Sequence, residues 1–252
     1  MMRYVLVFDM VKLSMKKYTF ALFLGLLIFA LPMFFISLTV TLAFGTESVY
    51  MYSVDNYEVV QKTGIDRQAL TTAMQAMVAF FKGGIDISEV LVNVNGELQP
   101  LFSQNEQLHF DDVRDILNMI RVSLWISGLL ILCSLITFLY CVIRNYRPQI
   151  DMILGCFKYS ALTVTTIFAV LGLVSLMGGF DYLFYWFHIL SFSNDLWMGT
   201  ESSRMVQLFP SEFFMHVSIM IALATCLEMA TLFLGCRSIV RIAHIGERRV
   251  YL

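Results

Sequence analysis

Charged residues are scarce in this chain, and their scarcity excludes an ordinary soluble protein. Lys, Arg, Asp and Glu make up 14% of the 252 residues, whereas 58% are hydrophobic and the mean hydropathy is +0.74. This composition is typical of a protein that crosses a membrane several times. The net charge of −2 gives no sign of a nucleic-acid partner, because such partners attract basic surfaces. We expect a single polytopic membrane domain over residues 1–252.

Cysteine is also rare, and its positions exclude two kinds of site. The five cysteines all lie in or beside apolar runs: Cys133, Cys141, Cys156, Cys226 and Cys236. Their spacing has the pattern of neither a disulfide framework nor a set of zinc ligands. We interpret them as small buried thiols.

Four apolar runs are long enough to cross a bilayer, which takes about 20 residues. They are Tyr18–Phe44, Asn118–Ile143, Tyr159–Met177 and Phe213–Cys236. The first run follows a basic N-terminus, as a secretory signal does, but it exceeds the roughly 7–15 apolar residues of such a signal. We therefore expect four membrane-spanning helices in a mainly α protein.

The basic residues are distributed unevenly between the two sides of these spans. Eleven of the 17 Lys and Arg lie at the N-terminus, in the loop after the second span and in the C-terminal tail. The positive-inside rule makes that side cytoplasmic. Both termini are then cytoplasmic, and residues 45–115 and 179–211 are extracellular.

The segment 45–115 is large enough to form a small α+β cap between the first two spans. Three closely spaced tyrosines predict a strand at its start: Tyr50, Tyr52 and Tyr57. Apolar residues at helical spacing over 65–81 predict an amphipathic helix that ends at Gly83–Gly84. The dipeptide Asn95-Gly96 between two strand-like runs predicts a β-hairpin.

A helix is also predicted where the cap leads into the second span. Ser103 and Glu106 have the spacing of a capping box, which satisfies free backbone donors at a helix N-terminus. His109 and Asp112 follow on this helix three residues apart, so they share one face. His109 would lie about two turns above the outer membrane surface.

The second outer segment, 179–211, is apolar but too aromatic and too interrupted for a membrane span. It places His188 among seven aromatic residues: Tyr182, Phe184, Tyr185, Trp186, Phe187, Phe192 and Trp197. Tyr and Trp concentrate where lipid tails meet water. We expect His188 in an interfacial loop at the membrane surface, beside an apolar groove.

The two outer histidines, His109 and His188, suggest acid–base chemistry on a lipid. Imidazole takes and gives protons near neutral pH. One histidine could deprotonate a nucleophile while the other stabilises or protonates the departing oxygen of an acyl group. The chain has no GxSxG motif and no cysteine in the outer segments, so we expect the substrate to supply the nucleophile. The two rings should then lie within about 10 Å of each other.

Other interpretations of these residues stay open at this point. A histidine in an aromatic interface is often no more than a hydrogen-bonded polar group. His109, Asp112 and His188 could form a metal site, although we favour Asp112 as a group that orients an imidazole. Glu228, inside the fourth span, is either protonated and hydrogen-bonded or part of a proton path.

Two functional alternatives follow from these residues. A proton path through Glu228 would suit a small transporter, although the inverted repeats typical of transporters are absent. A membrane scaffold that binds a partner through its cap would be non-enzymatic. We interpret His216 as structural and His244 as a solvated cytoplasmic residue.

Several short motifs follow one another in a particular order. They are Leu101-Phe102, Glu106-x-x-His109-x-x-Asp112-Val113, Phe187-His188, Phe192-Ser193-Asn194-Asp195-x-Trp197 and Leu208-Phe209-Pro210-x-x-Phe213-Phe214. In this order and spacing they resemble the lipoprotein intramolecular transacylase (Lit) family. The resemblance covers most of the chain, including the four spans and the two outer segments.

The resemblance implies a multi-pass acyltransferase of the bacterial plasma membrane, mainly from Gram-positive species. Its partners would be membrane lipid and lipoproteins whose N-terminal cysteine carries a diacylglyceryl group. The acyl chain would move from the glycerol sn-2 oxygen to the α-amino group of the same cysteine, giving an N-acyl lyso-form, with no cofactor or metal. The sequence does not indicate an oligomeric state.

The resemblance also implies roles for individual residues. The family's two catalytic histidines correspond to His109 and His188. In our first assignment His109, helped by Asp112, deprotonates the amine and His188 serves the carbonyl or leaving oxygen, while exchanged roles remain an alternative. Four residues are expected to support or orient the histidines: Asp112, Asn194, Asp195 and Trp197.

Overall fold

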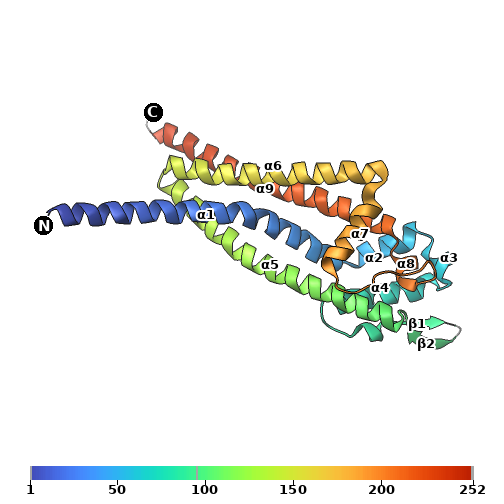
Figure 1. Ribbon diagram of the computed structural model, residues 1–252. Helices are drawn as coiled ribbons and strands as arrows, with labels where there is room; N and C mark the ends of the chain where they lie inside the picture. The colour runs from blue at the N-terminus through green and yellow to red at the C-terminus, as the bar shows by residue number, and fades with distance from the viewer. Residues whose placement is uncertain (1, 95, 251–252) are drawn as a thin grey trace. The chain divides into compact units, whose positions relative to one another are not determined.

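The computed structural model describes residues 2–94 and 96–250, and the side chains of residues 20–93 and 96–242. It is dominated by four helical segments that are long and apolar enough to cross a membrane (Figure 1). They are α1 (Met2–Phe44), α5 (Gln104–Ile143), α6 (Arg147–Val174) with its continuation through η2 (Ser175–Gly179) into α7 (Phe180–Ser191), and α9 (Ser211–Val250). This confirms the four predicted spans and the mainly α membrane fold.

The third helical segment begins earlier than the sequence suggested. We placed residues 144–158 in a cytoplasmic loop, but helix α6 starts at Arg147. The apolar face of this helix extends toward the N-terminus into the charged segment, because three of its residues are buried at helical spacing: Ile150, Ile153 and Phe157.

The chain divides into two compact units. Unit 1 comprises residues up to Phe35, Ser123–Thr166 and the chain from Thr225 on, and unit 2 comprises Ile36–Val122 and Ile167–Ala224. Both segments that the sequence analysis placed outside, 45–115 and 179–211, therefore belong to unit 2.

Unit 1 is a helical bundle whose interior is apolar apart from a few small polar groups. The hydroxyl of Ser160 donates to the carbonyl of Ile28 at 3.1 Å, and the thiol of Cys156 donates to the carbonyl of Leu24 at 3.8 Å. Such bonds tie α6 to α1 where lipid offers no competing partner. Cys141, Cys156 and Cys236 are buried as predicted, but Cys133 is exposed on the apolar helix surface.

Unit 2 begins with a helix where we predicted a strand. Residues Glu47–Asn56 form α2, followed by the short helix α3 (Val59–Thr63). The strand prediction was wrong because it relied on the tyrosines alone. Tyr50, Ser53 and Val54 are buried at the i, i+3, i+4 spacing of a helical face, and the acidic Glu47 suits a helix N-terminus.

The rest of the cap follows the sequence prediction. Asp66 caps α4 (Arg67–Phe81) by accepting hydrogen bonds from the backbone N–H groups of Gln68 and Ala69, and the helix ends before Gly83, whose φ is +81°. After a 3₁₀ turn, η1 (Ile87–Glu89), strands β1 (Leu91–Val94) and β2 (Glu97–Pro100) pair antiparallel, with Val94 opposite Glu97. This confirms the hairpin, although Asn95 of its turn lies outside the described residues.

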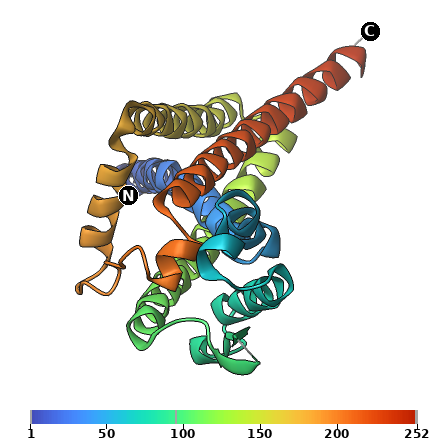
Figure 2. The ribbon, with the colours of Figure 1, turned by 90° about the vertical axis from the view of Figure 1, so that its right-hand side faces the viewer.

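One apolar core with several aromatic rings joins these elements to the second outer segment. It includes Tyr50, Phe80, Phe81, Phe102, Phe110, Phe209 and Phe213. Burial raises the pKa of Tyr50, whose hydroxyl donates to the carbonyl of Phe44 at 2.8 Å. The hydroxyl of Ser53 donates to the carbonyl of Leu208 in α8 (Arg204–Leu208). The first turns of α5 and the chain after α7 are thus held on one core (Figure 2).

Candidate active site

His109 lies in the second turn of α5 and is only 5% exposed. Glu106, one turn earlier, fixes the start of this helix by accepting hydrogen bonds from the backbone N–H and the hydroxyl of Ser103, both at 2.7 Å. The predicted capping box is therefore half formed: the Ser103 hydroxyl donates to the carboxylate instead of accepting a backbone N–H. The ring of Phe192 packs edge-on against His109, at 4.9 Å.

His188 lies near the end of α7 and is 7% exposed. Its Nδ1 is 2.7 Å from the carbonyl oxygen of Phe184, one turn earlier. A carbonyl only accepts, so Nδ1 carries the hydrogen and Nε2 is left as the acceptor of a neutral ring. The rings of Phe184 and Trp197 pack against the imidazole, at 4.3 and 4.8 Å.

The two imidazole rings lie side by side within unit 2. Their centroids are 6.1 Å apart, and their planes differ by 30°. This separation is well inside the ~10 Å that a shared reacting group requires. Two imidazolium ions so close together would repel each other and would be poorly hydrated, so simultaneous charge on both rings is disfavoured.

Two buried polar atoms beside the rings have no hydrogen-bond partner among the described residues. They are Nδ1 of His109 and Nε1 of Trp197. Buried polar atoms are rarely left unpaired, because each costs about 1–3 kcal/mol in lost solvation. Both atoms are therefore available to form hydrogen bonds with a bound molecule.

The loop after α7 is tied to α5 at two points. The side-chain amide of Asn194 donates to the carboxylate of Asp112 at 2.9 Å. One oxygen of Glu106 accepts from the hydroxyl of Ser203 and from the backbone N–H of Met205, both at 2.8 Å. Figure 2 shows this loop beside the first turns of α5. These contacts hold the loop next to the histidines.

Asp112 is bonded to the second outer segment, and the orienting role that we expected for it stays a prediction. No hydrogen bond of the described residues joins Asp112 to His109, and its carboxylate accepts from Asn194 instead. The spacing of His109 and Asp112 correctly puts them on one helix, but the partner of Asp112 comes from 82 residues further along the chain. The side chain of Asp195 is exposed and does not contact the histidines by a described hydrogen bond.

Sequence reasoning missed two groups that shape this site. The carbonyl of Phe184 orients His188, but a backbone carbonyl has no signature in the sequence. Glu106 was recognised only as a capping residue, whereas two of its four hydrogen bonds, from Ser203 and Met205, also fasten the loop. A carboxylate in both a capping box and a family motif was a signal for a second function.

The other polar candidates have surroundings of their own or lie outside the described side chains. Nδ1 of His216 is 2.6 Å from the hydroxyl of Tyr57, consistent with the structural role we expected. Glu228 belongs to unit 1, and the side chain of His244 lies outside the described residues. Among the described side chains, no group of three His, Cys, Asp or Glu could hold a metal ion.

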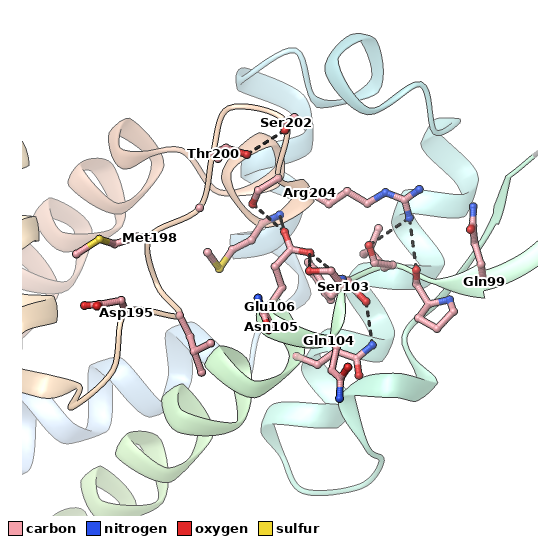
Figure 3. A pocket seen from close by; sticks show the side chains of 18 residues that line it. Gln99, Ser103, Gln104, Asn105, Glu106, Asp195, Met198, Thr200, Ser202 and Arg204 are labelled. Carbon is pink, nitrogen blue, oxygen red and sulfur yellow. Dashed lines mark hydrogen bonds between the residues drawn. The ribbon is translucent and has the colours of Figure 1, made fainter.

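A pocket of about 740 Å³ is lined by residues that lie close in sequence to the two histidines (Figure 3). Its walls are the end of the hairpin and the first turn of α5 on one side, residues 99–107, and the loop of residues 195–205 on the other. Glu106 lies between the two walls. The pocket is wholly within unit 2.

Comparisons with known proteins agree on one family. The family model described as lipoprotein intramolecular transacylase Lit matches residues 25–214. The in meso structure of the membrane integral lipoprotein intramolecular transacylase Lit from Bacillus cereus is similar with a TM-score of 0.69 at 18% identity, over 92% of this chain and 99% of that chain.

Two further structures of the Bacillus cereus protein are similar as well, each with one histidine substituted. The arginine variant has a TM-score of 0.67 at 18% identity, over 97% of this chain and 100% of that chain. The alanine variant has a TM-score of 0.67 at 18% identity, over 94% and 99%. No curated protein matches the chain. The structures establish the fold, and the family model spans about three quarters of the sequence, so the chain belongs to the Lit family of membrane-integral acyltransferases, the lipoprotein intramolecular transacylases.

Proposed function

We propose that His109 and His188 act as an acid–base pair that moves the sn-2 acyl chain of a diacylglyceryl-cysteine to the α-amino group of the same cysteine. The product is an N-acyl lyso-form lipoprotein. The observation that carries the proposal is the 6.1 Å separation of two buried imidazole rings in a largely aromatic setting. Amine and ester belong to one bound molecule, so positioning supplies much of the rate.

His188 is the better candidate for the general base. Its Nδ1 hydrogen is held by the carbonyl of Phe184, so Nε2 is the free acceptor that can take a proton from the attacking amine. This reverses our first assignment, which gave the base to His109 because Asp112 was expected to orient it. Among the described residues Asp112 accepts from Asn194 and makes no hydrogen bond to His109, which favours the exchanged roles.

His109 and Trp197 are placed to serve the oxygen atoms. The ring of His109 lies 6.1 Å from that of His188 and its Nδ1 is unpaired, so His109 can take over the proton from His188 and donate it to the departing glycerol oxygen without both rings being charged together. The unpaired indole N–H of Trp197, whose ring lies 4.8 Å from His188, is a donor for negative charge developing on the carbonyl oxygen. Such preformed donors are usually the largest contribution to acyl-transfer catalysis.

The reaction balances without another reactant. The amine nitrogen attacks the ester carbonyl carbon while His188 takes one N–H proton. The tetrahedral intermediate then collapses, the bond from carbon to the sn-2 oxygen breaks, and that oxygen takes a proton from the histidine pair. An ester and an amine become an amide and an alcohol, and the pair ends with the same number of protons.

The surface of α7 supports access from lipid. Several of its side chains are exposed and apolar: Tyr182, Tyr185, Trp186, Phe187, Ile189 and Leu190. Such a surface is stable at the boundary of a membrane. We place residues 45–115 as an extracellular cap and 179–211 as an interfacial loop, because the basic residues gather on the other side of the spans. The active face is then outside the cell.

Substitution of the histidines tests the proposal. We expect His109→Gln and His188→Gln each to abolish lyso-form product in cells, as measured by mass spectrometry of lipoprotein N-termini. His216→Gln is the matched control, because His216 is a partly buried histidine of the same unit that bonds to Tyr57. Unchanged lyso-form product from both His109→Gln and His188→Gln would contradict the proposal and favour a non-enzymatic scaffold.

A further inference from the structure

We propose that the pocket between residues 99–107 and 195–205 binds the peptide backbone of the residues that follow the lipidated cysteine. This inference rests on the proposed function, since it assigns the part of the lipoprotein that does not react. A lipoprotein substrate has two acyl chains that favour lipid and a peptide that favours water, so its peptide needs a polar exit from the site. The pocket between residues 99–107 and 195–205 provides one.

The pocket continues directly from the elements that carry the histidines. Glu106 lines it and precedes His109 by three residues of α5, a rise of about 4.5 Å along the helix. Asp195 lines the opposite wall and follows Asn194, whose amide donates to Asp112. A peptide leaving the reacting cysteine therefore reaches this pocket within its first residues.

Eight of the 18 lining residues carry a side-chain amide or hydroxyl, and they stand beside apolar residues. They include Gln99, Gln104, Asn105, Thr200 and Ser202. Figure 3 shows Gln104 and Asn105 on the α5 side of Glu106, and Thr200 with Ser202 on the loop side. Amides and hydroxyls both donate and accept, which matches the alternating N–H and C=O groups of a peptide backbone. An acyl chain would leave these groups unpaired.

The charged groups of the pocket are largely occupied. The carboxylate of Glu106 accepts four hydrogen bonds from Ser103, Ser203 and Met205. The guanidinium of Arg204 donates to the carbonyls of Pro100 and Leu101, at 3.4 and 3.2 Å. With these charges engaged, the lining is better suited to a neutral backbone than to a phosphate or another anion.

The size of the pocket sets the length of peptide that it can hold. A volume of about 740 Å³ lies within the range of pockets that enclose a drug-sized ligand. An extended chain advances about 3.3–3.6 Å per residue, so three to four residues cover roughly 10–14 Å. Binding through the backbone would also make the enzyme tolerant of different side chains at these positions.

A series of substrates tests the inference on the purified full-length protein in lipid nanodiscs. The probes are diacylglyceryl-cysteine amide and the same lipid with one, three or five following residues. We expect kcat/KM of the wild-type protein to rise at least tenfold from the amide to the three-residue substrate and then to level off. A further substrate with proline at the second position, which lacks one N–H, should lose part of this gain.

Variants locate the effect in the pocket. Asn105→Trp and Ser202→Trp put a large ring on exposed lining positions and should lower kcat/KM for the three-residue substrate several-fold more than for the amide. Gln68→Trp, an equivalent exchange on the exposed face of α4, is the control and should keep the wild-type profile.

The outcomes separate this inference from the proposed function. Equal kcat/KM for the amide and the longer substrates would overturn the peptide site while leaving the acyl transfer intact. Pocket variants whose kcat/KM values match those of Gln68→Trp for every substrate would overturn the location of the peptide site in this pocket. A wild-type protein that transfers no acyl chain in any of the four substrates would overturn the proposed function itself.

Discussion

Nδ1 of His188 lies 2.7 Å from the carbonyl oxygen of Phe184, one turn earlier in α7. The helix backbone thus fixes the tautomer of this histidine without a carboxylate. In acyl-transfer sites built on a triad, an acidic residue does the same task. Here Asp112, three residues after the other histidine, accepts a hydrogen bond from Asn194.

The bond from Asn194 to Asp112 should matter through positioning. We expect Asn194→Ala to lower kcat about tenfold with a smaller change in KM, because a hydrogen bond to a charged group contributes about 1.5–3 kcal/mol and holds the loop beside the site. Asp112→Asn keeps an acceptor oxygen and should retain more activity. Steady-state kinetics on a lipopeptide give both constants. A lower unfolding temperature with unchanged kcat would show a purely structural role.

Trp197→Phe should separate the indole N–H from the packing of its ring. The variant keeps an aromatic ring beside His188 but removes the unpaired donor Nε1. We expect kcat to fall about a hundredfold, in the range of a lost oxyanion donor, with the unfolding temperature little changed. Trp186→Phe, an exposed tryptophan of α7, is the control and should turn over normally. Wild-type turnover by Trp197→Phe would remove this residue from the mechanism.

Several features of this protein were readable from the sequence, and the reasons differ. The four spans follow from the length of the apolar runs, and α4 follows from apolar spacing between Asp66 and Gly83. The hairpin follows from its Asn-Gly dipeptide. These are local signals, because each is decided by neighbouring residues.

The errors arose where distant parts of the chain decide the outcome. Helix α2 is stabilised by burial of Tyr50 and by the bond from Ser53 to Leu208, 155 residues away, and a strand prediction from tyrosine spacing misses both. The partner of Asp112 is likewise remote. Composition and spacing placed His109 and His188 near membrane boundaries and suggested that they act as a pair, and the family resemblance implied catalytic roles for both before the structure gave their distance.

Glu106 should stabilise the loop over the site. We expect Glu106→Ala to destabilise unit 2 by about 2–4 kcal/mol, because its buried carboxylate accepts four hydrogen bonds, and Glu106→Gln to cost less. Chemical denaturation in detergent measures the change. Faster hydrogen exchange over residues 195–205 should accompany it, while Glu97→Gln on the exposed hairpin serves as the control. Unaltered hydrogen exchange over residues 195–205 in Glu106→Ala would contradict this role of Glu106.

The orientation of the chain is open to a direct test. We expect Gln61→Cys, on the exposed surface of α3, to react with a membrane-impermeant maleimide in intact cells, and Tyr146→Cys, between α5 and α6, to react only after lysis. The parent protein with its five native cysteines gives the background. The reverse pattern would place the cap and the histidine pair on the cytoplasmic side.

The most direct measurement of the central claim follows the acyl chain itself. Purified protein is mixed with two lipopeptides that differ in peptide mass, one of which carries a deuterated sn-2 chain, and the products are read by mass spectrometry. We predict that the heavy chain appears only on the nitrogen of its own peptide, and that His109→Gln and His188→Gln form no N-acyl product. Heavy chain on both peptides, or normal product from the two variants, would contradict intramolecular transfer by this histidine pair.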